Sequence, residues 1–115
     1  MNPQSSVDSR HKPRREVDGR IDVLDCMTGQ VIGRVGNISE SGMLLLAGIP
    51  LRGDALYQLR FNLAAAGEPA CPIEVGAHLL WLEPGRSQGR AWAGLHFIHL
   101  SSRHRKALLD WIGCG

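Results

Sequence analysis

The sequence predicts a small antiparallel β-barrel with one C-terminal α-helix and a flexible N-terminal arm. Three observations predict this mainly all-β fold. Apolar and polar residues alternate with a period of two along much of the chain, as in half-buried strands. Glycine, proline, serine and asparagine recur about every ten residues, where short strands would turn. Near the end, the apolar pattern changes to the helical period, which indicates a single amphipathic helix.

Length and composition limit the possible function classes. The 115 residues are enough for one domain but not for two. Hydrophobic residues make up 43% and charged residues 21%, a balance that is typical of globular proteins and argues against overall disorder. The formal net charge is only +2, so the bulk charge gives no indication of nucleic-acid binding.

Residues 1–16 have the composition of a flexible basic arm, with very few apolar side chains. They lack the apolar core of a signal peptide, and no stretch of the chain approaches the roughly 20 apolar residues that span a bilayer. The three cysteines are widely spaced and odd in number, which is typical of a reducing compartment. We therefore expect a cytoplasmic protein without membrane contact, in which residues 17–115 form a single domain.

Glycine-containing turns separate the first three predicted strands. Residues 18–25 alternate between polar and apolar side chains, and residues 27–30 predict a hairpin turn. The apolar run at 31–38 contains Gly33 and a second glycine three residues later, which predict a bulge or a tight bend. Residues 43–46 are wholly apolar, as expected of a strand that is buried on both faces.

The second half of the chain predicts three further strands and the helix. Residues 56–63 show the cleanest alternation, and residues 73–81 repeat it. A loop at 83–89 leads to the last predicted strand, 91–98. Ser101 is a plausible N-cap, and Gly113 would end the helix that it begins. The apolar face of that helix consists of Ala107, Leu108, Trp111 and Ile112.

Signs of catalysis are missing from the sequence. It contains no G-x-S-x-G, no P-loop and no H-E-x-x-H motif. The histidines are scattered, and His96 and His99 are spaced so that a strand would point them to opposite faces. The carboxylates form no recognisable acid/base pair. We therefore expect no enzyme, no catalytic residue, no metal site and no cofactor.

Two short motifs precede the third predicted strand. The first, R-x-x-x-R, lies in the arm, and the second, N-x-S-x-x-G, begins about 23 residues later in a polar turn between two apolar runs. Near the end of the chain, Gly94–Phe97 reads Gly-Leu-His-Phe and is followed by the short helix. In this order, from Arg10 to about Ile112, the chain resembles the PilZ domain family.

The resemblance implies a six-stranded β-barrel that acts as a receptor for the bacterial second messenger cyclic di-GMP. Arginine suits this ligand because its planar fork pairs with phosphate or with the O6/N7 edge of guanine, and it also stacks on bases. The motif residues carry over as the two arginines, the guanine-contacting turn and the glycine that shapes the turn. The implied site consists of the motif residues Arg10, Arg14, Asn37, Ser39 and Gly42, together with two further candidates, Arg15 and Trp81.

For some of these positions the sequence leaves two interpretations open. Many family members have aspartate where this chain has Asn37, whose amide oxygen still accepts a hydrogen bond but without the strength of a charged acceptor. Ser9 stands where another arginine is often found, and Arg15 could compensate for it. Trp81 is either a stacking platform for guanine or a packing residue. For Trp92 and Trp111 we expect packing in the core.

The leading hypothesis is a stand-alone PilZ domain that binds cyclic di-GMP and relays the signal to an unidentified effector protein. One alternative is a ligand-independent PilZ-like adaptor, although such members typically lack the arginine motif that this chain has. The other is a small β-barrel that binds single-stranded nucleic acid. The near-neutral charge and an aromatic content of only 5% argue against that alternative, and no DNA partner is expected.

Overall fold

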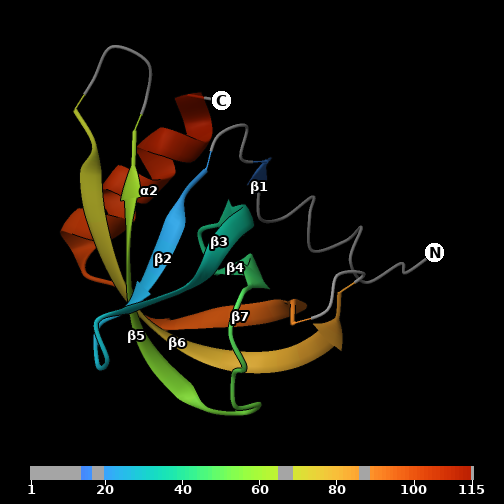
Figure 1. The fold of residues 1–115 in the computed structure, drawn as a ribbon. Coiled ribbons are helices and arrows are strands. Elements are labelled where there is room, and N and C mark those ends of the chain that lie inside the picture. Colours follow the sequence, from blue (N-terminus) through green and yellow to red (C-terminus); the bar gives the residue numbers. More distant parts are fainter. Residues whose placement is uncertain (1–13, 17–19, 65–68, 86–88, 115) are drawn as a thin grey trace.

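The computed structural model describes residues 14–16, 20–64, 69–85 and 89–114 (Figure 1). Within these ranges the chain forms seven strands and one helix. Their order is β1 (Arg14–Glu16), β2 (Asp22–Asp25), β3 (Gln30–Ser39), β4 (Gly42–Ala47), β5 (Leu56–Leu63), β6 (Cys71–Pro84), β7 (Ala91–His99) and α2 (Ser102–Cys114).

Six of the strands close into a barrel. The hydrogen-bonded order is β3-β2-β5-β6-β7-β4, and β4 pairs again with β3, so the sheet returns to its first strand. Every pairing is antiparallel. Figure 1 shows the second half of β6 curving beside β7, whereas its first half lies next to α2. The predicted six-stranded antiparallel barrel with a C-terminal helix is therefore confirmed.

The alternation along the strands produces the core. In β5, Leu59, Phe61 and Leu63 are buried, whereas the intervening Arg60 and Asn62 are exposed. The same period repeats around the barrel, so each strand contributes one apolar row to a common interior. Complete burial of a Leu or Phe side chain contributes about 1.5–3 kcal/mol, and this makes a one-residue slip of register costly.

The β2–β3 hairpin and the bend in β3 follow the expected glycine positions. Gly29 has a φ of 75° in the hairpin turn, and Asp25 Oδ1 accepts a hydrogen bond from the Met27 backbone N–H at 2.9 Å. The β3–β4 register shifts between Val35 and Asn37, which leaves one extra residue on β3. The predicted irregularity in this strand is therefore confirmed as a β-bulge.

The C-terminal helix packs against β6 and β3 and lies beside the end of β5 (Figure 1). Ser101 caps it, because its Oγ accepts a hydrogen bond from the His104 backbone N–H at 3.2 Å. Trp111 is buried, as predicted, and its Nε1 donates to the Ala64 carbonyl at 3.2 Å. The expected helix end at Gly113 is wrong by one residue, since the helix continues to Cys114. No helix within the described ranges is long and apolar enough to cross a membrane.

Candidate functional site

The two motifs meet at the edge of β3. Strand β1 pairs antiparallel with the last part of β3, so that Arg14 lies opposite Ser39 and Arg15 opposite Ile38. Paired strands run about 4.8 Å apart, which makes these backbone positions direct neighbours. The three residues of β1 belong to the segment predicted as an arm, and here they form part of the sheet. Arg10, the first arginine of the motif, lies outside the described residues.

The turn between β3 and β4 is held by the hydroxyl of Ser39. This side chain is completely buried. Its Oγ donates to the Gly42 carbonyl at 3.4 Å, accepts from the Ser41 backbone N–H at 3.3 Å and lies 3.3 Å from Ser41 Oγ. The serine of the N-x-S-x-x-G motif therefore fixes the shape of the turn from within.

Gly42 is required because two backbones approach closely at this point. A Cβ atom placed on Gly42 would collide with the carbonyl oxygen of Leu95 on the neighbouring β7. Its φ does not lie in the left-handed region, in contrast to Gly29 and Gly89. Of the two reasons that the sequence offers for a glycine here, close approach is therefore the one that applies.

The strand register aligns Asn37 with Trp81. Glu16 of β1 pairs with Asn37 of β3, which pairs with Leu44 of β4, then with Gly94 of β7 and finally with Trp81 of β6. These residues form one row across five strands. Asn37 and Trp81 are separated by three inter-strand spacings, or roughly 14 Å measured along the sheet. The row thus connects the motif turn with the aromatic candidate.

The indole of Trp81 lies directly on the backbone of Gly94. The three atoms nearest to a Cβ built on Gly94 all belong to the Trp81 ring, and the tryptophan remains 45% exposed. A flat, partly exposed ring that rests on backbone atoms is the arrangement needed to stack a base. Trp92 lies in a similar way against Gly36, with its Cζ3 3.0 Å from the position of a Cβ. Trp92 is only half-buried, so the expectation of a core position for it is wrong.

An ion pair connects the motif turn to the helix. Arg105 Nη1 of α2 lies 3.5 Å from Glu40 Oε2, and Glu40 is the fourth residue of the N-x-S-x-x-G motif. Both side chains are partly exposed, so the pair contributes at most about 1 kcal/mol to stability. Arg105 is not among the site residues that the sequence implies. Nothing in the sequence pattern links residues that lie 65 positions apart.

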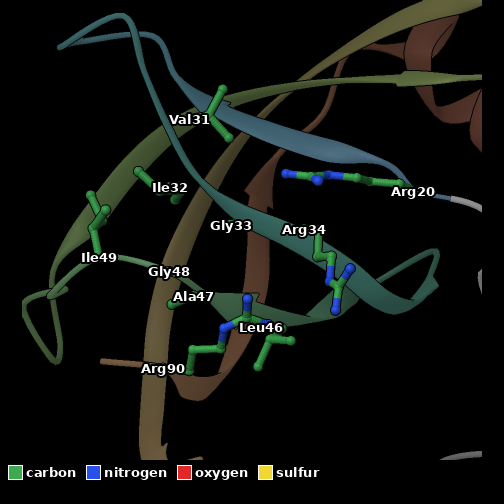
Figure 2. Close-up of a pocket in the computed structure, with 10 residues that line it drawn as sticks. All are labelled: Arg20, Val31, Ile32, Gly33, Arg34, Leu46, Ala47, Gly48, Ile49 and Arg90. Atoms are coloured by element: carbon green, nitrogen blue, oxygen red, sulfur yellow. The ribbon is translucent and has the colours of Figure 1, made fainter. Parts of the chain in front are cut away.

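Sequence reasoning also missed a hollow lined by three arginines. Arg20, Arg34 and Arg90 surround a cavity of about 250 Å³ next to the β3–β4 pair (Figure 2). None of the three is among the site residues that the sequence implies, and they lie far apart along the chain. Among the described residues, no three His, Cys, Asp or Glu side chains gather as they would around a metal ion.

Comparison with known proteins agrees with this architecture. A family model of the PilZ domain matches residues 8–113. The solved structure of the inhibitor of motility MotI/DgrA from Bacillus subtilis has a TM-score of 0.73 and 19% identity, and the match covers 91% of this chain and 49% of that one. The PilZ domain of YcgR from Escherichia coli, solved with c-di-GMP, has a TM-score of 0.67 and 15% identity, with coverages of 91% and 89%.

At these identities the two structures establish a common fold, and this chain spans about half the length of the Bacillus protein. A comparison with curated proteins finds no match. The family model, however, covers nearly the whole chain, from the arginine motif to the end of the helix. The chain therefore belongs to the PilZ domain family, a family of cyclic di-GMP receptors.

Proposed function

We propose that this chain is a cyclic di-GMP receptor that has no catalytic activity and needs no cofactor. One observation carries the proposal. The β1–β3 register puts the end of the R-x-x-x-R motif next to the N-x-S-x-x-G turn, although the two motifs are separated in the sequence. A ligand that bears both phosphates and guanines needs arginine forks and amide or backbone groups close together, and this register makes backbone positions of the two motifs neighbours.

The row of residues across the sheet supports the same ligand. Asn37 in this row is half-buried, and the indole of Trp81 at its end is exposed. Between them stand the half-buried Leu44 and Gly94, whose backbone supports the indole. We propose that one guanine contacts Asn37 and that Trp81 stacks on a base. Stacking of this kind contributes about 1–3 kcal/mol per base.

We further propose that the signal passes to an effector protein. Ligand contact at the motif turn would change the position of Glu40, and Glu40 is paired with Arg105 of α2. The turn and the exposed face of the helix therefore form a continuous surface whose shape depends on the ligand. The Bacillus neighbour is named as an inhibitor of motility, which is consistent with an output through protein contact.

Calorimetric titration with cyclic di-GMP, GTP and a single-stranded oligonucleotide tests the proposal. We expect binding of cyclic di-GMP alone. Arg14→Ala should weaken it roughly ten- to a hundredfold, because one charge-assisted hydrogen bond is worth about 1.5–3 kcal/mol. Arg103→Ala is the matched control, since Arg103 is an exposed arginine on α2. A protein that binds none of the three compounds would instead be a ligand-independent adaptor, and preference for the oligonucleotide would indicate a nucleic-acid binder.

A further inference from the structure

The arginine-lined hollow lies apart from the two motifs. Arg34 is on β3 opposite Leu46, whereas Asn37 lies three residues further along the same strand. At about 3.3 Å per residue, this spacing separates the two positions by roughly 10 Å. Arg90 directly precedes β7, whose first residue pairs with Ala47 at the end of β4. Figure 2 shows the three arginine side chains around one opening beside Gly33 and Leu46.

The charges around this hollow are not balanced. Arg20 Nε lies 2.7 Å from Asp22 Oδ1, so one arginine has an acidic neighbour. Within the described residues, the guanidinium groups of Arg34 and Arg90 take part in no side-chain hydrogen bond and no ion pair. Three guanidinium groups and one carboxylate leave a surplus of two positive charges on a concave surface. Such a surface concentrates anions.

The volume and the lining residues of the hollow indicate which class of anion fits it. A volume of about 250 Å³ accommodates a phosphoryl or diphosphoryl group with a small attached body; it is below the roughly 300–1,000 Å³ of sites that enclose drug-sized ligands. Gly48 leaves open space where a side chain would stand. Val31 and Ile49 supply apolar surface at the rim. Planar guanidinium forks match the oxygen geometry of phosphate better than a single ammonium group does.

From these observations we infer a second binding site, formed by Arg20, Arg34 and Arg90, for a small phosphorylated ligand with at least two negative charges. It is separate from the motif surface and goes beyond the proposed cyclic di-GMP function. Arg34 and Arg90 provide the unbalanced charges, and Arg20 is oriented by Asp22. The missing side chain of Gly48 leaves open space in which the ligand can approach the backbone.

The test uses inorganic pyrophosphate as the probe and the full chain at low salt. Calorimetry should show saturable binding, and amide NMR should show shifts at Gly33 and Gly48. We expect Arg34→Gln and Arg90→Gln each to weaken binding about tenfold or more, as loss of a charge-assisted contact does. Arg103→Gln removes the same charge from α2 and should leave binding unchanged. Gly48→Phe fills the hollow without changing its charge and should abolish binding, and an unchanged far-UV circular dichroism spectrum is required of each variant to show that it is folded.

Cyclic di-GMP titrated into the same variants separates this inference from the proposed function. Unchanged cyclic di-GMP affinity together with lost pyrophosphate binding supports two sites. The inference is overturned if pyrophosphate shows no saturable binding, if Arg103→Gln weakens binding as much as Arg34→Gln does, or if Gly48→Phe still binds. It is also overturned if Arg34→Gln and Arg90→Gln weaken cyclic di-GMP and pyrophosphate equally, because the hollow would then belong to the motif surface. Failure of wild-type cyclic di-GMP binding would contradict only the proposed function.

Discussion

Gly94→Ala should destabilise the protein only when Trp81 is present. A Cβ on Gly94 would collide with the Trp81 ring, and the three nearest atoms all belong to that ring. Forcing a methyl group into a packed contact costs about 1–3 kcal/mol of unfolding free energy. In a Trp81→Ala background the obstacle is gone, and alanine in place of a strand glycine should stabilise by about 0.5–1 kcal/mol. The two backgrounds should therefore differ by roughly 1.5–4 kcal/mol.

Urea denaturation of the four proteins in this cycle measures the difference. Far-UV circular dichroism is the suitable signal, since Trp81→Ala removes a fluorophore. Gly42→Ala provides the matched control, because its Cβ would meet the backbone carbonyl of Leu95, which cannot rotate away. It should destabilise equally in both backgrounds. An equal cost of Gly94→Ala with and without the indole would refute the placement of Trp81 on Gly94. The stacking platform proposed for the ligand would then lose its support.

Three shorter predictions concern the turn, the ligand and a thiol. Ser39→Ala removes a buried hydroxyl that holds the β3–β4 turn, and it should lower the free energy of unfolding by about 1–3 kcal/mol in chemical denaturation; no loss would mean that the turn does not depend on it. Asn37→Asp should retain or tighten cyclic di-GMP binding in calorimetry, because a charged acceptor strengthens the same contact, whereas Asn37→Ala should weaken binding. Burial, with a contribution from the charge of Glu74, raises the pKa of Cys26. With the other two cysteines replaced by serine, alkylation at mildly alkaline pH should be slower than for free cysteine and faster in Glu74→Gln, and the reverse order would contradict that environment.

The strands could be predicted where one face is buried and the other is solvated. β5 has the bounds 56–63 that its alternation predicts, because every second residue enters the core. β6 is longer than the predicted 73–81 and runs from Cys71 to Pro84. The three residues after Trp81 are all exposed, so no alternation marks them in the sequence. Backbone pairing with β7 extends this part of the strand, and single-sequence patterns do not report such pairing.

The residues of the candidate site likewise differ in whether a local sequence pattern predicts them. Both motifs are short and local, so they can be found in the sequence, and their resemblance to the PilZ family implies a ligand with phosphates and guanines. The alignment of Trp81 with Asn37 depends on register, including a shift between Leu79 and Trp81 that no periodicity predicts. The core position predicted for Trp92 failed for a related reason. Trp92 lies on β7 and reaches across β4 to Gly36 on β3, and an indole can cover a glycine from outside the barrel.

The arginine-lined hollow forms because the barrel closes, so the sequence alone does not reveal it. Arg20, Arg34 and Arg90 are each unremarkable as single exposed cations, and the last two are 56 positions apart. They come together because β4 pairs with β3 on one side and with β7 on the other. The same two pairings also connect the motif turn to Trp81. One strand, β4, therefore links both surfaces, and the motif surface and the hollow lie at opposite ends of its ladder. Residues of both surfaces are therefore held in place by the backbone hydrogen bonds of the same strand.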